Sequence, residues 1–255
     1  MTDRSAERAP EKPRASGLWE TAKTIVYAVL IALAVRTVAF EPFNIPSGSM
    51  IPSLLVGDYL FVSKYSYGYS RYSLPLSLPL FPNRLFFTEP ARGDVAVFKL
   101  PADNSTDYIK RIVGLPGDRM QVVRGILHIN GEAVRRTPRG EYVYRDESGR
   151  IVRAQLYRET LPGGRSHDII ELSDNGPLDN TPVFVVPPGH YFAMGDNRDN
   201  SLDSRVASAV GFVPARNLVG RAETLFFSIE SPARIWEVWK WPSAIRLSRF
   251  FQSIE

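Results

Sequence analysis

The feature that most restricts the fold of this chain is an apolar run near its N-terminus, TIVYAVLIALAV at residues 24–35. Lys23 and Arg36 bound the run, and basic side chains at the ends of an apolar helix can reach the two interfaces of a membrane. As a helix, residues 19–40 span roughly 33 Å at ~1.5 Å per residue, enough to cross a hydrocarbon core of ~30 Å. We therefore predict a single transmembrane helix at residues 18–40.

Two other interpretations of this segment stay open. The uncharged part is short, which also suits a buried helix of a soluble protein or the core of a signal peptide. The triplet Ala32-Leu33-Ala34 has the small-x-small form of a signal-peptide cleavage site. In every case, Glu41-Pro42 and Pro46 should end the helix soon after Phe40.

The flanks of the apolar run set the expected topology. Residues 1–17 are polar and charged, which predicts a disordered tail. Basic residues precede the run at positions 4, 8, 12, 14 and 23, so the positive-inside rule places the N-terminus in the cytoplasm. Residues 41–255 are then expected on the outer side of the membrane.

The rest of the chain has the pattern of a mainly β protein built from antiparallel strands. Short β-rich runs alternate with turn residues, and Asn130-Gly131 between two such runs indicates a tight hairpin. Residues 68–90 are expected to form a surface loop, and the charged stretch at about 124–182 an inserted β-rich subdomain. Strands are predicted at residues 59–62, 94–98, 108–113, 119–123, 126–129, 142–144, 151–157, 168–172, 183–186, 191–194, 211–213 and 222–227.

Composition excludes several kinds of chemistry. The sequence has no cysteine, which rules out disulfides, thiol catalysis and thiolate metal sites. Its three histidines are scattered, which argues against a metal centre and against a Ser-His-Asp triad. Starting at Asp199, the acidic segment lacks the glycine and glutamate of a calcium loop. The net charge of +4 comes without a dense basic run, so no nucleic-acid partner is expected.

The C-terminal stretch is aromatic and basic. Residues 235–241 contain three of the four tryptophans, and residues 245–251 add Phe beside Arg. This composition suits a membrane interface. The favoured interpretation is a strand and a short helix packed on the body.

Lys110 is a candidate general base. In a strand over residues 108–113, Tyr108, Lys110 and Ile112 share one face, and Arg111 points to the other. Apolar surroundings lower the pKa of a lysine because burial penalises its charged form. A snorkelling lysine at a strand edge is the alternative without function.

Two further segments contain candidate catalytic groups. In the proline-bounded turn with Ser47-Gly48-Ser49, one serine can act as nucleophile and the other hydroxyl as a donor to an oxyanion. The same residues also suit an ordinary turn. In the acidic segment at residues 195–205, pairing of Asp203 with Arg205, or of Asp196 with Arg198, would fix the loop.

Taken together, the motifs resemble those of the type I signal peptidases, bacterial membrane-bound endopeptidases with a Ser/Lys dyad. The resemblance covers about residues 20–228 but not the insertion or the tails. It rests on Pro-Ser-Gly-Ser-Met at 46–50, Arg-Gly-Asp-Val at 92–95, Tyr-Ile-Lys-Arg with Val-Gly-Leu-Pro-Gly-Asp at 108–118, and Gly-Asp-Asn-Arg-Asp-Asn-Ser with Asp-Ser-Arg at 195–205.

The resemblance implies roles for the matching positions. Ser49 would be the nucleophile and Lys110 the neutral base, while Ser47 and the Ser49 N–H would hold the oxyanion. Ser201 would orient Lys110, and Asp203 with Arg205 would brace the site. Substrate pockets for small side chains at positions −1 and −3 would be walled by Phe43, Ile45, Leu54, Tyr108 and Ile109.

The resemblance also implies the setting. The substrates would be secretory preproteins, cleaved at the outer face of the inner (plasma) membrane near a secretion translocon and beside membrane lipid, with no cofactor and no metal. Family members often have two membrane spans, whereas this chain shows one. A self-cleaving repressor-type Ser/Lys protease and an inactive membrane-anchored binding module remain the alternatives.

Overall fold

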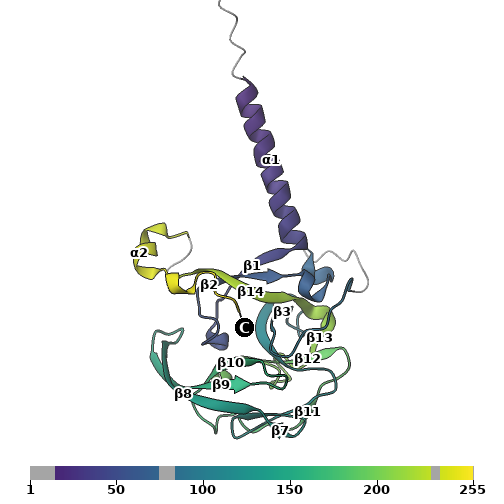
Figure 1. Cartoon of the computed structure of the whole chain (residues 1–255), viewed down its shortest axis with the longest axis vertical. Coiled ribbons are helices and arrows are strands. Elements are labelled where there is room, and N and C mark those ends of the chain that lie inside the picture. The colour runs from purple at the N-terminus through teal and green to yellow at the C-terminus, as the bar shows by residue number, and fades with distance from the viewer. Residues whose placement is uncertain (1–14, 75–83, 231–235, 255) are drawn as a thin grey trace, which may run out of the picture.

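A computed structural model describes residues 15–74, 84–230 and 236–254. Helix α1 (Ala15–Val38) projects from a β-rich body (Figure 1). Its stretch Trp19–Val38 is long and apolar enough to cross a membrane, with a mean hydropathy of 1.6, and it is not buried by the rest of the chain. The predicted helix at residues 18–40 is thus confirmed as a helix. The predicted tail lies largely outside the described residues, and its last three residues are helical.

The helix ends two residues earlier than predicted because the chain enters a strand, β1 (Phe40–Asn44), which the sequence analysis did not anticipate. β1 contains Pro42, which has no N–H to donate to a neighbouring strand. Proline is tolerated there because β1 lies at the edge of its sheet and pairs only with β2 (Asp58–Ser63).

The predicted antiparallel β architecture is confirmed. The largest sheet has seven strands in the order β1-β2-β14-β3-β4-β12-β13. Its remaining strands are β14 (Leu218–Ser228), β3 (Val95–Lys99), β4 (Asp107–Gly114), β12 (His190–Met194) and β13 (Val213–Pro214). β1, β2 and β14 lie next to the foot of α1 (Figure 1).

Two smaller sheets complete the body on the side away from α1 (Figure 1). One has the order β11-β5-β6-β7, built from β11 (Phe184–Val185), β5 (Arg119–Val123), β6 (Ile126–Ile129) and β7 (Glu132–Ala133). The other has the order β10-β9-β8, built from β10 (Ser166–Glu171), β9 (Ile151–Thr160) and β8 (Arg135–Arg145). Residues 124–182 therefore hold a complete three-stranded sheet, but β6 and β7 continue the sheet that β5 begins.

The Asn-Gly hairpin forms as predicted. Asn130 and Gly131 have φ of +57° and +87°, the left-handed pair that a two-residue turn between antiparallel strands requires. His128 pairs with Ala133 and Ile129 with Glu132 across this turn.

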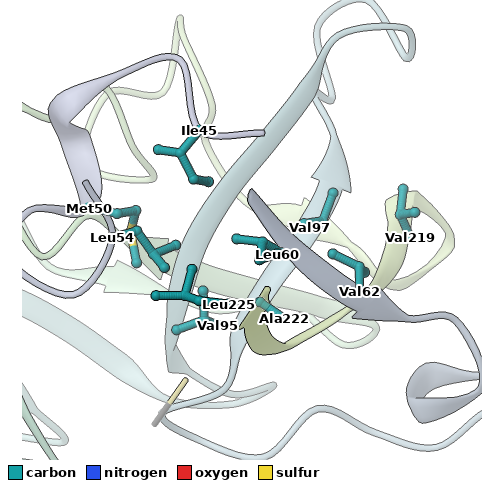
Figure 2. Packing of buried hydrophobic residues seen from close by; sticks show 10 residues of the cluster. All are labelled: Ile45, Met50, Leu54, Leu60, Val62, Val95, Val97, Val219, Ala222 and Leu225. Atoms are coloured by element: carbon teal, nitrogen blue, oxygen red, sulfur yellow. The ribbon is translucent and has the colours of Figure 1, made fainter. Parts of the chain in front are cut away.

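Apolar side chains from the seven-stranded sheet form the core beside the 3-10 turn Gly48–Met50. Figure 2 shows this cluster, in which Met50 and Leu54 lie at one side, next to side chains of the sheet strands such as Leu225 and Val95. Both Met50 and Leu54 are fully buried. The residues that follow Ser49 in the sequence are thereby anchored in the core.

The C-terminal region packs on the body through short helices rather than through a regular strand. Arg246 and Arg249 bind the buried carboxylate of Asp58, and the Trp241 ring lies 5.2 Å from that of Phe227. The packing interpretation is therefore confirmed for this part of the stretch, while Trp239 is 70% exposed. Among the described residues, the short helices are α2 (Trp241–Ala244) and the 3-10 turns Gly48–Met50, Tyr65–Tyr67, Arg71–Ser73, Arg198–Asn200, Ala215–Asn217, Val238–Lys240 and Leu247–Arg249.

Candidate active site

Ser49 lies in a rigid turn just after β1. It sits within the 3-10 turn Gly48–Met50, and only 8% of the residue is exposed. Asn197 holds this turn twice, since its backbone N–H donates to Ser49 O at 3.1 Å and its side-chain amide donates to Gly48 O at 3.0 Å. Sequence reasoning assigned no role to Asn197, although it falls inside the acidic motif.

Lys110 reaches Ser49 from β4, an interior strand of the seven-stranded sheet. Its Nζ lies 2.6 Å from Ser49 Oγ, although the two residues are 61 apart in the sequence. The residue is 3% exposed, and its amine lies 5.5 Å from the centre of the Tyr108 ring. The sheet thus brings the two predicted groups into direct contact.

Burial lowers the pKa of Lys110 from its ordinary 10.5 to about 8. The nearby carboxylates of Asp203 and Asp196 act in the opposite direction and raise it, whereas Arg205 lowers it. At a pKa of about 8, about a tenth of the amine is neutral at pH 7. The amine is therefore able to accept a proton near neutral pH.

An open cleft of about 560 Å³ runs past the two groups. The cleft is lined by Ser47, Ser49, Lys110 and Ser201. Within it, the hydroxyl oxygen of Ser47 lies 3.4 Å from that of Ser49. If Ser49 attacked a carbonyl carbon, a hydroxyl at this distance would be positioned to donate to the oxygen that becomes negatively charged.

The predicted pocket walls divide into two groups. Tyr108 and Ile109 line the cleft. Ile45 and Leu54 are instead buried in the core cluster with Phe43 packed against it, and none of the three lines the cleft in the described part of the chain. These three residues therefore lie in or against the core cluster next to the cleft, and their role as walls of substrate pockets stays a prediction.

The loop after β12 contains the ion pair of Asp203 with Arg205. Arg205 forms a bidentate ion pair with Asp203, with both contacts at 2.9 Å. The Asp203 carboxylate also accepts a hydrogen bond from the Gly195 N–H at 3.0 Å. Ser201 lines the cleft and is buried, but its hydroxyl has no hydrogen-bond partner among the described residues. The predicted bond from Ser201 to Lys110 is therefore not present.

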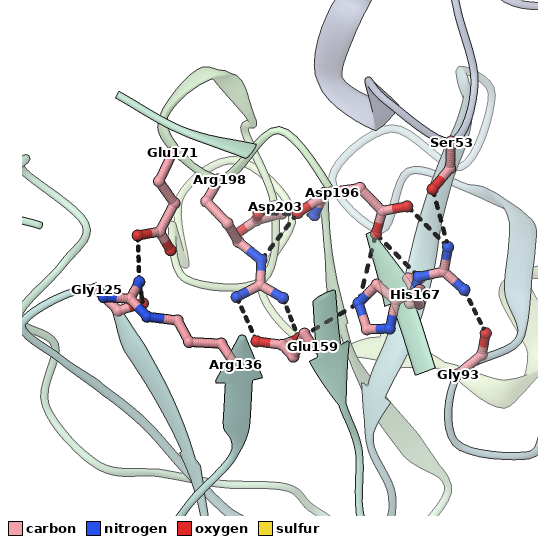
Figure 3. A network of polar contacts seen from close by, with 12 residues as sticks. Ser53, Gly93, Gly125, Arg136, Glu159, His167, Glu171, Asp196, Arg198 and Asp203 are labelled. Carbon is pink, nitrogen blue, oxygen red and sulfur yellow. Dashed lines mark hydrogen bonds and ion pairs between the residues drawn. The ribbon is translucent and has the colours of Figure 1, made fainter. Parts of the chain in front are cut away.

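A buried ionic network links this loop to β4 and to the inserted sheet (Figure 3). Arg111 on β4 binds both carboxylate oxygens of Asp196, at 2.9 and 2.8 Å. Arg198 binds both oxygens of Glu159 on β9. The expected pairing of Asp196 with Arg198 is thus wrong, because each residue has a better-placed partner on another element.

The network contains two residues that sequence reasoning missed. Glu159 and His167 come from β9 and β10, and the His167 Nε2 lies 3.3 Å from a Glu159 carboxylate oxygen and 3.8 Å from Asp196 (Figure 3). Arg111 lies on the face of β4 opposite to Lys110, as the alternation predicted. The described residues contain no group of acidic or histidine side chains that would hold a metal ion.

Comparison with known proteins agrees with the motifs. The family described as "Signal peptidase, peptidase S26" matches residues 18–227. The chain is 40% identical over 248 residues to signal peptidase I of Rickettsia typhi (strain ATCC VR-144 / Wilmington), covering 91% of this chain and 92% of that protein. It is 41% identical over 249 residues to signal peptidase I of Rickettsia canadensis (strain McKiel), again covering 91% and 92%.

A solved structure of signal peptidase I from Enterococcus faecalis V583 is 25% identical, with a TM-score of 0.30, and covers 52% of this chain and 97% of that chain. The sequence matches place this β-rich chain in a class of peptidases. The chain belongs to the signal peptidase family, peptidase S26.

Proposed function

We propose that this chain is a membrane-anchored serine endopeptidase that removes signal peptides from secretory preproteins, with Ser49 as nucleophile and Lys110 as its neutral general base. The observation that carries this proposal is the 2.6 Å separation between Lys110 Nζ and Ser49 Oγ inside a buried site. The names of the relatives supply the substrate class. Both groups stand on rigid elements, which favours a fixed attack geometry.

The reaction is an acyl transfer in two stages. Ser49 Oγ attacks the scissile carbonyl carbon while Lys110 takes the hydroxyl proton, and the Ser47 hydroxyl with the Ser49 N–H donates to the resulting oxyanion. The C–N bond then breaks, and Lys110 gives the proton to the leaving amine. Water then attacks the acyl-enzyme while Lys110 accepts its proton. The C–O bond to Ser49 breaks, Lys110 returns the proton to Ser49 Oγ, and the signal peptide leaves with a free carboxyl end.

The position of the site fits a membrane-tethered substrate. Ser49 follows the end of α1 by few residues, so a helix that spans the membrane holds the cleft near its surface. In the proposed orientation, the N-terminus is cytoplasmic and the catalytic domain lies on the outer side of the plasma membrane. Anchoring enzyme and preprotein to the same membrane raises their effective concentration.

The pH dependence should report the lysine. Because only the neutral amine accepts a proton, kcat/KM for preprotein cleavage should rise as Lys110 deprotonates, with a midpoint near its pKa of about 8. Well below that pH, kcat/KM should fall about tenfold per pH unit. Initial rates measured in detergent from pH 5 to 10 check this, and a flat profile through pH 8 would argue against a lysine base.

Gly195 should be sensitive to a single added methyl group. A Cβ at this position would lie 2.2 Å from Ser201 Oγ and 2.5 Å from Ser49 O, closer than any real contact allows. Gly195→Ala should therefore displace the nucleophile and lower kcat by about 100-fold, the cost expected of a misplacement near 1 Å.

The matched control for this substitution is Gly17→Ala, in the exposed first turn of α1, where a Cβ meets nothing within 4 Å. It should retain the wild-type kcat. Thermal unfolding of both variants separates a misplaced nucleophile from a loss of folding. A folded Gly195→Ala enzyme with unchanged kcat would show that this contact does not position Ser49.

A further inference from the structure

The hairpin formed by β8 and β9 ends in a turn at the active-site cleft. Its turn is closed by its own hydrogen bonds, since the Asp146 N–H donates to Arg150 O and the Gly149 N–H donates to Asp146 O, both at 2.9 Å. The Asp146 carboxylate also accepts hydrogen bonds from Ser148 and Arg150. Glu147, between these residues, takes no part in holding the turn together.

The body holds the hairpin in place below its tip. One apolar cluster joins the hairpin to Ile51, which follows Ser49 by two residues. The hairpin contributes Tyr142, Tyr144 and Ala154 to it. The Asn197 amide, which also holds Gly48, donates to the Tyr144 hydroxyl at 3.3 Å. The tip is thus attached to the same framework that positions the nucleophile turn.

Glu147 lines the cleft together with Ser47, Ser49 and Lys110. Its carboxylate accepts the backbone N–H of Gly48 at 3.4 Å. This is long for a hydrogen bond of this kind, so a substrate would displace it at little cost. The side chain is exposed and free to contact a peptide in the cleft.

The other carboxylates of the cleft are already engaged. Asp107 forms an ion pair with Lys99 at 2.9 Å. Asp199 accepts the backbone N–H groups of Leu172 and Ser173. Within residues 15–74, 84–230 and 236–254, Glu147 forms no ion pair and accepts only one long hydrogen bond, so its exposed carboxylate has the weakest protein contacts of the three in this cleft.

We propose that Glu147 is a specificity residue that reads the charge of a substrate side chain next to the scissile bond, favouring a basic side chain and disfavouring an acidic one. This inference rests on the proposed function, because it assigns a preference to the same site. The enzyme would then select substrates by side-chain charge near the cleavage point as well as by the small residues expected at positions −1 and −3.

The expected effect is moderate because the carboxylate is exposed. A pair of opposite charges at a solvent-exposed site changes kcat/KM by a few-fold, and a swap from attraction to repulsion changes it by about tenfold. Raising the salt concentration from 0.05 to 0.5 M should shrink the effect, since exposed charges are screened. A purely steric role of the side chain would not respond to salt.

The test uses the full-length chain in detergent and a set of synthetic signal-peptide substrates. Ala is kept at −3 and −1, and Lys, Gln or Glu is placed in turn at −2, +1 and +2. At one or more positions, the wild type should cleave the Lys peptide about tenfold faster than the Glu peptide in kcat/KM. Glu147→Gln should bring this ratio close to one, and Glu147→Lys should invert it.

The matched controls are Glu132→Gln and Glu132→Lys, which make the same charge changes at an exposed position on β7 outside the cleft. They should keep the wild-type ratio. The pH midpoint of Glu147→Gln should also stay at that of the wild type, because Asp203 and Asp196 are the carboxylates that raise the pKa of Lys110.

Two results would overturn the inference while leaving the proposed function intact. One is an unchanged Lys-to-Glu ratio in both Glu147 variants, and the other is a shifted pH midpoint with unchanged selectivity, which would make Glu147 a positioning residue. A wild-type enzyme that cleaves none of the peptides, nor a full preprotein, would instead refute the proposed function itself.

Discussion

Ser49→Ala and Lys110→Met are each expected to lower kcat for preprotein cleavage by at least about 10⁴-fold. The first removes the attacking oxygen, and the second removes the only amine of the described residues in hydrogen-bond contact with it. Methionine has nearly the length of lysine and suits a buried site, so Lys110→Met should fold. Cleavage of a purified preprotein, followed over hours with a high enzyme concentration, resolves a loss of this size.

The double variant sharpens this prediction. If the two groups act as one unit, Ser49→Ala with Lys110→Met should be no slower than the worse single variant. Lys240→Met, which removes an amine outside the cleft, serves as the matched control and should leave kcat unchanged. Activity within tenfold of the wild type in either single variant would refute the dyad.

Asp196→Ala should produce the largest loss of stability. Arg111 is fully buried and its guanidinium binds both oxygens of Asp196, so removing the carboxylate leaves a buried charge without its main counter-ion. Breaking a buried pair in this way costs about 3–5 kcal/mol of the free energy of unfolding. Burial alone would raise the pKa of Asp196, but Arg111 holds it below its ordinary 3.8, so the pair stays ionised at neutral pH.

Chemical denaturation of the wild type and variants measures this loss. The matched control is Asp168→Ala, whose carboxylate is one-third exposed and lies 3.4 Å from Arg158. It should cost less than about 1 kcal/mol. Replacing both partners, as in Asp196→Leu with Arg111→Met, should recover much of the loss. A loss below about 1 kcal/mol in Asp196→Ala would mean that the network does not hold the loop.

The sequence predicted those helices, strands and turns that a short run of neighbouring residues is enough to indicate. The apolar run marked α1, alternating residues between turn residues marked most strands, and Asn130-Gly131 marked a hairpin down to its left-handed φ angles. β1 was missed because Pro42 argues against a strand, and its tolerance depends on an edge position that only the fold reveals.

The candidate site shows the same division. The Asp203–Arg205 pair lies two residues apart and was predicted, whereas Arg111 and Asp196 lie 85 residues apart and Arg198 and Glu159 lie 39 apart. Many carboxylates compete for each arginine at such separations, and the packing of the sheets selects among them. Ser49 and Lys110 were found through their motifs, although their contact also depends on the fold.

The proposed mechanism requires that Lys110 loses its proton near neutral pH, and NMR measures this protonation directly. The sequence has six lysines, so lysine selectively labelled with ¹³C and ¹⁵N gives a small set of side-chain signals, and the signal absent from Lys110→Met identifies Lys110. We predict that this signal titrates with a pKa of about 8, as burial of the amine requires. A titration midpoint at or above the ordinary value of 10.5 would contradict the account.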